Sequence, residues 1–196
     1  MPTPTHWIFD LDGTLTLAVH DFDAIRVELG LPLGQGILEA LDELPPDVSG
    51  PKHQRLDAIE RELAYASRPQ PGILVRLDEL HAAGVPMGIL TRNTRDNALA
   101  SLAAIGAKSY FDPEVVLGRD EAAFKPDPAG ILALLARWQA EPARALFAGD
   151  GHYDLLTGRA ASVQTLHFDT AATFAYPEIT DHRVSNWEAP HPLLTR

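Results

Sequence analysis

Five short apolar runs recur along this 196-residue chain, and three of them end in polar residues. The runs are HWIFD at 6–10, VPMGILT at 85–91, EVVLG at 114–118, ALFAGD at 145–150 and VQTLHF at 163–168. They are too continuous for strands with one face in water, and they are typical of a parallel sheet that is covered on both faces. This pattern favours an α/β architecture.

The segments between these runs have helical periodicity. GILVRLDELHAAG at 72–84 and TRDNALASLAAIG at 94–106 repeat apolar residues at intervals of three and four, and each ends on a glycine suited to a C-cap. DPAGILALLARWQ at 127–139 offers Asp127 as the N-cap and Pro128 as the first helical residue. Strands that alternate with helices predict a doubly wound parallel sheet.

Residues 16–70 interrupt this alternation and contain no convincing strand. They predict two or three amphipathic helices, DFDAIRVELG, GILEALDELP and PKHQRLDAIERELAYAS, separated by LPLGQG and PPDVSGP. We therefore expect a helical cap at 16–70, inserted into an α/β core of residues 1–15 and 71–196. The tail from about residue 171 looks irregular and carries little information about function.

Charge and composition exclude several classes of partner. The formal net charge of -11 would repel a nucleic-acid backbone or an anionic membrane, so neither is an expected partner. The chain has no cysteine, starts with no basic leader and has no apolar run of membrane-spanning length. These features predict a cytoplasmic protein, and they leave its oligomeric state open.

Polar residues at the ends of the apolar runs mark the expected site, because ligands of such sheets gather at the carboxyl ends of the strands. The residues concerned are Asp10, Asp12, Thr91, Arg92, Asn93, Lys125, Asp150 and Asp154. Carboxylate oxygens suit Mg²⁺, whereas lysine, hydroxyl and backbone N–H donors suit a phosphate group. The set predicts a magnesium and phosphate site.

Asp10 and Asp12 stand two residues apart and can take different roles. A carboxylate at a strand end, held ionised by a metal, can attack phosphorus as a nucleophile, which assigns Asp10 to an aspartyl-phosphate. Asp12 can then act as the general acid and base. Leu11 between them is expected in the core, and Gly13 allows a sharp turn that brings backbone N–H groups near the phosphate.

Four segments together resemble the motifs of the haloacid dehalogenase-like superfamily of phosphatases. They are DLDGTL at 10–15, ILTRN at 89–93, KPDP with Lys125, and GDGHYD at 149–154, in the order that the superfamily shows. The resemblance covers residues 1–15 and roughly 71–168. The insert is similar to the small helical caps of phosphoglycolate phosphatase-like and β-phosphoglucomutase-like members.

The resemblance implies a role for each matched residue. Asp10 is the nucleophile and Asp12 the acid/base. Thr91 and Lys125 bind phosphate, with Arg92 and Asn93 lining the pocket beside them. Asp10, Asp150 and the backbone carbonyl of Asp12 hold Mg²⁺, and Asp154 is an outer acid or an additional metal-site carboxylate. The chain departs from the family at Gly151, where a serine or threonine is common, and the next residue, His152, is expected to be a surface residue.

We therefore expect a magnesium-dependent phosphatase of a small phosphorylated metabolite, phosphoglycolate-like or a sugar phosphate. A phosphomutase of the same fold and a catalytically idle protein that binds a phosphorylated ligand are the alternatives. A dehalogenase of the same fold is disfavoured, because it needs neither a general acid nor a metal and the expected site offers both. A phosphonate hydrolase needs a cap lysine, and this option is weak because Lys52 is the only lysine in the insert.

One basic residue of the insert can bind the leaving group of the substrate. The candidates are Arg26, Lys52, His53, Arg55, Arg61 and Arg68.

Overall fold

A computed structural model of the chain describes residues 1–189 and 193. Its strands are β1 (His6–Phe9), β2 (Met87–Leu90), β3 (Val116–Leu117), β4 (Ala145–Gly149), β5 (Gln164–Phe168) and β6 (His182–Val184). Its α-helices are α1 (Phe22–Leu29), α2 (Ile37–Asp42), α3 (Pro46–Tyr65), α4 (Ile73–Ala82), α5 (Arg95–Ala104), α6 (Ala129–Trp138) and α7 (His152–Ala160). Short 3₁₀ turns cover Lys108–Tyr110, Pro113–Val115, Pro142–Arg144 and Pro177–Ile179.

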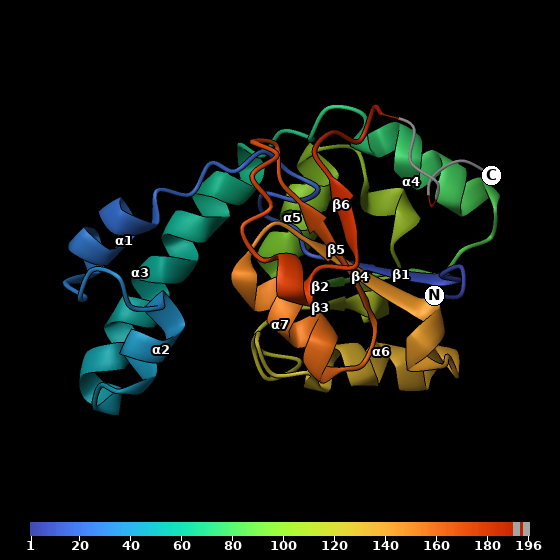
Figure 1. Ribbon diagram of the computed structural model, residues 1–196. Helices are drawn as coiled ribbons and strands as arrows, with labels where there is room; N and C mark the ends of the chain where they lie inside the picture. Colours follow the sequence, from blue (N-terminus) through green and yellow to red (C-terminus); the bar gives the residue numbers. More distant parts are fainter. Residues whose placement is uncertain (190–192, 194–196) are drawn as a thin grey trace.

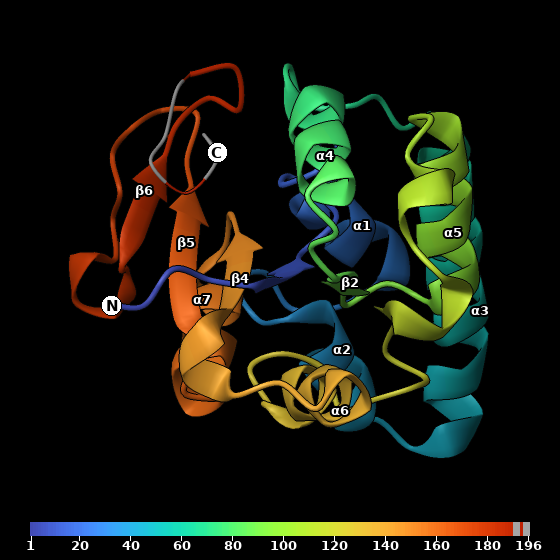
Figure 2. The same cartoon turned by 90° about the vertical axis from the view of Figure 1, so that its right-hand side faces the viewer.

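The six strands form one sheet in the order β3-β2-β1-β4-β5-β6, and every neighbouring pair is parallel. Helices α4 and α5 lie on one face, and α6 and α7 lie on the other (Figures 1 and 2). The order turns back at β1, which lies between β2 and β4, so the carboxyl end of β1 is a topological switch point. The predicted doubly wound parallel sheet is confirmed.

Two apolar cores, one on each face, explain why the strand runs are continuous. Trp7 and Phe9 of β1 pack with α4 and α5, whereas Ile8 between them packs with Ile131 and Leu134 of α6. All of these side chains are buried. Because successive residues of a strand face opposite sides, each needs an apolar partner on its own side.

Helices α1–α3 form a separate layer beside the sheet, and they bury a small apolar core of their own (Figure 1). Asp21 caps α1 by accepting a hydrogen bond from the Ala24 amide, at 2.9 Å. Two linkers join this layer to the sheet and pair with each other at Thr16 and Pro69. The helix α3 also packs along α5, where the hydroxyls of Ser67 and Ser101 are hydrogen bonded.

The structure corrects two predictions about element boundaries. The helix α3 begins at Pro46 and includes most of PPDVSGP, because a proline at the first helical position is tolerated and Pro51 loses a single hydrogen bond. The helix α6 begins at Ala129, with Pro128 as the N-cap, while the Asp127 carboxylate accepts from the Ala129 amide.

The tail is also more ordered than predicted. Residues 182–184 form β6, which extends the sheet at its edge, and the Asp181 carboxylate accepts the Thr165 amide and pairs with Arg159. Beyond β6, the buried indole of Trp187 stacks on Phe168 with 4.7 Å between ring centroids. The strand was missed because three residues are too short to show alternation.

Candidate active site

The loop that follows β1 places Asp10 at the carboxyl edge of the sheet, in a buried position. The Thr14 hydroxyl donates to Asp10 Oδ2 at 3.2 Å. Gly13 turns the chain with φ of 93°, and a Cβ atom there would lie 2.1 Å from a carboxylate oxygen of Asp150. A glycine is required at this position because both the conformation and the space exclude a side chain.

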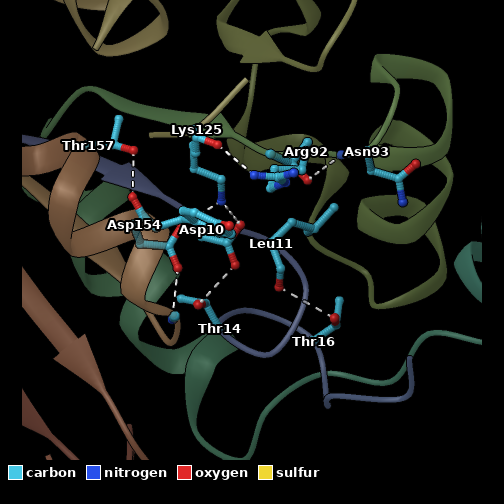
Figure 3. A network of polar contacts seen from close by, with 12 residues as sticks. Asp10, Leu11, Thr14, Thr16, Arg92, Asn93, Lys125, Asp154 and Thr157 are labelled. Atoms are coloured by element: carbon cyan, nitrogen blue, oxygen red, sulfur yellow. Dashed lines mark hydrogen bonds and ion pairs between the residues drawn. The ribbon is translucent and has the colours of Figure 1, made fainter. Parts of the chain in front are cut away.

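Lys125 connects two acids from different motifs (Figure 3). Its Nζ lies 2.5 Å from Asp10 Oδ1 and 2.5 Å from Asp154 Oδ1, and all three side chains are buried. Burial alone would lower the pKa of the lysine, but the two carboxylates outweigh burial and raise the pKa. The lysine therefore stays charged and holds Asp10 in a fixed orientation.

Three carboxylates converge beside this lysine. One oxygen each of Asp10, Asp150 and Asp154 lies within 4.8 Å of the others. Burial raises the pKa of Asp150 to about 7, and the charge of Asp154 adds to the effect. Burial also raises the pKa of Asp10, despite Lys125.

An all-oxygen set of acids that repel one another fits a divalent cation, and Mg²⁺ prefers such ligands. The sequence placed Asp154 as an outer acid or an additional metal-site carboxylate. The structure brings one of its oxygens within 4.8 Å of both other acids, so Asp154 can be a metal-site carboxylate.

Asp12 lies outside the cluster of three and lines the cavity in front of it. Its side chain is partly exposed. Its charge contributes to the raised pKa values of both Asp150 and Glu60, so it faces the acids of the core and the cap. This position leaves Asp12 open to a ligand in the cavity.

Thr91 and Asn93 follow β2, and both are buried and line the cavity. The Thr91 hydroxyl oxygen accepts from the Asn93 amide at 3.1 Å, which leaves the hydroxyl proton available for donation. The Asn93 side-chain oxygen accepts from the Thr94 amide and from Asn97, so it fixes the start of α5.

Arg92 lines the cavity, as the sequence predicted, and its guanidinium also contacts the cap. Its guanidinium lies between the rings of Phe124 and Tyr153, 5.0 and 4.7 Å from their centroids. Nη1 donates to the carbonyl of Lys125 at 2.6 Å, and Nη2 donates to Glu39 of α2 at 2.6 Å. Both terminal nitrogens are thus engaged in joining cap and core.

Several residues that support the site carry no motif signal. Gln70, in the second linker, donates to the carbonyl of Gly13 at 3.0 Å, and Trp187 donates to the carbonyl of Thr14 at 3.0 Å. The tail and the linker therefore hold the loop that carries Asp10 and Asp12. The only sequence signal for Gln70 is its position just before the predicted helix at 72–84.

Arg119 forms a second bridge from the core to the cap. It is hydrogen bonded to Asp57 and lies 2.8 Å from a carboxylate oxygen of Glu60, both on α3. Burial raises the pKa of Glu60 to about 7, although Arg119 opposes this shift. Glu60 also lines the cavity, so the cap contributes an acid to the site.

The cavity between core and cap measures about 310 Å³. Its floor is formed by the acids and by Thr91 and Asn93, and its cap side includes His20, Phe22, Arg26, Leu38, Leu56 and Glu60. Of the basic cap residues considered from the sequence, Arg26 is the one that lines it within the described part of the chain. His152 is exposed, as expected of a surface residue, and its ring lies 4.7 Å from that of Tyr176 at a tilt of 33°.

Comparison with known proteins identifies the family. A family model described as haloacid dehalogenase-like hydrolase matches residues 7–168. The chain belongs to this family. The resemblance drawn from the four motifs is confirmed, and so is the expected enzyme class, a hydrolase.

Curated relatives of this haloacid dehalogenase-like hydrolase carry phosphatase names. A phosphoglycolate phosphatase of Agrobacterium fabrum is 29% identical over 195 residues, covering 88% of this chain and 82% of the relative. The pyrophosphatase PpaX of Bacillus velezensis is 30% identical over 182 residues, covering 81% and 80%. A hydrolase from Pseudomonas syringae shares the fold, with a TM-score of 0.74 at 21% identity and coverage of 93% and 94%.

Proposed function

We propose that this enzyme is a phosphatase that hydrolyses a phosphate monoester of a small metabolite through an aspartyl-phosphate on Asp10. The observation that carries the proposal is the bridge of Lys125 between Asp10 and Asp154, because it joins three motifs in one buried site below a cavity. The names of the two curated relatives, a phosphoglycolate phosphatase and a pyrophosphatase, support hydrolytic release of phosphate.

The domain organisation is part of this proposal. Residues 16–70 would act as a cap over a core of residues 1–15 and 71–196. The separate apolar core of α1–α3 and the paired linkers at Thr16 and Pro69 support this division. A cap that closes would exclude water from the phosphoryl group during its transfer to Asp10.

Asp10, Asp150 and Asp154 would hold the cation, together with the backbone carbonyl of Asp12 that the family resemblance implies. A bound Mg²⁺ supplies positive charge that neutralises these acids and the phosphate. Lys125 and the Thr91 hydroxyl would bind non-bridging phosphate oxygens. The backbone N–H groups of Leu11 and Asp12 have no recorded acceptor in the described part of the chain, so they can serve the same group.

The reaction would then proceed in two displacements. A carboxylate oxygen of Asp10 bonds to phosphorus as the bond to the leaving oxygen breaks, and Asp12 gives that oxygen its proton. Asp12 next takes a proton from a water molecule, whose oxygen attacks phosphorus. The bond between phosphorus and Asp10 breaks, and this step releases inorganic phosphate and restores the carboxylate of Asp10 and the protonated acid of Asp12.

Release of inorganic phosphate from a panel of phosphorylated metabolites, with Mg²⁺ and with excess chelator, tests the proposal. We expect turnover that the chelator abolishes, and Asp10→Asn should lose both turnover and the trapped phosphoenzyme. Asp120→Asn, at an exposed carboxylate of the core, is the matched control and should keep both. Full activity in chelator, or a phosphoenzyme in Asp10→Asn, would contradict the mechanism.

The same assay separates the two alternatives. A phosphomutase would transfer the phosphoryl group to a second hydroxyl and release little free phosphate. An idle binding protein would form no phosphoenzyme. We expect the substrate to be a small soluble compound of the cytoplasm. Among the described residues, no helix is both long enough and apolar enough to cross a membrane.

A further inference from the structure

The cap side of the cavity is mainly apolar, with few charged groups. Phe22, Leu38 and Leu56 form part of the wall, and Arg26 and Glu60 lie among them. The carbon atoms of a leaving group can pack against this wall, while its polar groups need the charged residues. Charged side chains that are not already paired within the protein therefore determine which leaving groups the cavity binds.

Most charges around the cavity are already paired within the protein. Glu39 neutralises Arg92 at 2.6 Å, and Arg119 lies 2.8 Å from Glu60. Other cations of the cap are engaged outside the cavity. Lys52 donates to the carbonyl of Leu29, and Arg55 pairs with Glu28 at 2.5 Å.

Arg26 differs from these residues. Its Nε donates to the carbonyl of Gln35 at 2.7 Å and its Nη1 to Asp23 at 2.9 Å, while no partner of Nη2 is recorded among the described residues. The Arg26 side chain is 16% exposed and that of Asp23 is 73% exposed. Because Asp23 lies in water, its charge is strongly screened and neutralises the guanidinium only weakly.

A second group on the same side also lacks a partner. His20 precedes α1, lines the cavity and stacks on Phe22 with 5.5 Å between ring centroids. Its Nδ1 is buried, with no hydrogen-bond partner within the described chain. A buried nitrogen of this kind is stabilised when a ligand supplies the missing partner.

We infer that Arg26 determines specificity by binding an anionic group of the leaving alcohol. The preferred substrates are then phosphate monoesters whose alcohol carries a carboxylate or a second phosphate. This inference rests on the proposed function. The guanidinium can give an oxyanion a charge-assisted hydrogen bond, and because the Arg26 side chain is only 16% exposed, such a bond is stronger than it would be in water.

Matched substrates test the inference on the unmodified enzyme. The phosphate ester of a short hydroxy acid is compared with the phosphate ester of its primary amide, which has nearly the same shape and no charge. The bisphosphate of the matching diol is compared with its monophosphate. We expect kcat/KM to favour at least one anionic member by tenfold or more, and the pair that shows the preference identifies the anion as carboxylate or phosphate.

Variants of Arg26 then assign the preference to this residue. Arg26→Gln should reduce the ratio of the two kcat/KM values by about 10- to 100-fold, the effect of one lost charge-assisted hydrogen bond. Most of this loss should appear in KM, because the contact is made before the chemical step. Arg55→Gln removes a cap charge outside the cavity and should leave the ratio unchanged.

Arg26→Lys covers the case in which Arg26→Gln does not fold, because both variants lose the bond to Gln35 but the lysine keeps the charge. It should retain more of the ratio than Arg26→Gln. Equal ratios for the charged and neutral members in the unmodified enzyme, an unchanged ratio in Arg26→Gln, or equal losses in both variants would overturn the inference. Hydrolysis of p-nitrophenyl phosphate by the unmodified enzyme keeps these outcomes distinct from failure of the proposed function, in which no ester is cleaved.

Discussion

The core side of the cavity is a network of buried charges, whereas the ion pair of Arg92 with Glu39, which joins the cap to the core, is partly open to water. Lys125 and its two partners are each at most 6% exposed. In the cap contact, Arg92 and Glu39 are 22% and 30% exposed. Breaking a buried pair leaves a charge without solvent, but water replaces the partner in an exposed pair.

This difference suits the two tasks of the enzyme. In the proposed mechanism the acids and the lysine keep one geometry while a phosphoryl group is transferred, and the high cost of separating them provides that rigidity. The cap would move to admit a substrate, and the weak pair between Arg92 and Glu39 would break at small cost. We therefore expect substitutions to have large effects in the core network and small ones at the cap contact.

The largest effect should follow the loss of Lys125. Lys125→Met leaves Asp10 and Asp154 buried beside each other without a cation, so turnover should fall below detection. The free energy of unfolding should fall by about 3–5 kcal/mol, as measured by urea unfolding. Lys108→Met, at an exposed lysine, is the control and should change stability by less than about 0.5 kcal/mol. A stable Lys125→Met would show that the network is not the rigid part of the molecule.

The next largest effect should be a loss of turnover without a loss of stability, at Asp12 on the core side of the cavity. Asp12 lines the cavity outside the Lys125 network, so Asp12→Asn should fold with nearly unchanged stability. Turnover of an alkyl phosphate should fall by about 10²- to 10⁴-fold, the usual contribution of general acid and base catalysis. The deficit should be smaller for p-nitrophenyl phosphate, because its phenolate needs less protonation. Equal deficits on both esters would remove the acid role from Asp12.

The sequence predicted the core side better than the cap side, and the reason is physical. Asp10, Thr91, Lys125 and Asp150 follow apolar runs, and parallel strands bring their carboxyl ends together at one edge. The apolar runs thus predicted that residues far apart in the sequence meet at one edge of the sheet. The five strands, the helices at 73–82 and 95–104 and the three helices of the insert followed from the same periodicities.

What the sequence missed depends on contacts without a local pattern. Glu39 lies 53 residues from Arg92, and Asp57 lies 62 residues from Arg119, so no spacing reveals either pair. Arg92 lines the cavity, as expected from its place after the matched threonine, but its contact with Glu39 of the cap was not foreseen. Trp187 supports the Asp10 loop from 173 residues away. Such partners are fixed by the way the cap and the tail pack.

A pH-dependent effect tests whether the cap side is strained by its buried acid. The pKa of Glu60 is raised by burial from 4.5 to about 7, so the folded state keeps a proton that the unfolded state loses. The contribution of Glu60 to stability is therefore fully present below pH 4.5 and is lost as the pH rises to about 7. The loss should be no more than about 3 kcal/mol.

Urea unfolding at pH 5 and pH 8 measures this loss, with Glu60→Gln as the test. The variant should lose less stability over this interval than the unmodified enzyme does. Glu62→Gln, at an exposed acid of the same helix, should show the unmodified dependence. If Glu60→Gln and the unmodified enzyme lose the same free energy of unfolding between pH 5 and pH 8, Glu60 ionises freely and Arg119 fully compensates its burial.

The smallest effect concerns the pair between Arg92 and Glu39, which is the most direct test of a weak cap contact. Glu39→Gln should change the free energy of unfolding by less than about 1 kcal/mol, because both side chains remain accessible to water. The cap would be open for a larger fraction of the time, so KM should rise by up to about fivefold. Glu28→Gln breaks a comparable exposed pair, with Arg55, that lies entirely within the cap, and it should leave KM unchanged. If both variants raise KM equally, the effect comes from the stability of the cap itself. If Glu39→Gln instead destabilises the protein as strongly as Lys125→Met, the cap is part of the rigid core and the contrast between the two sides fails.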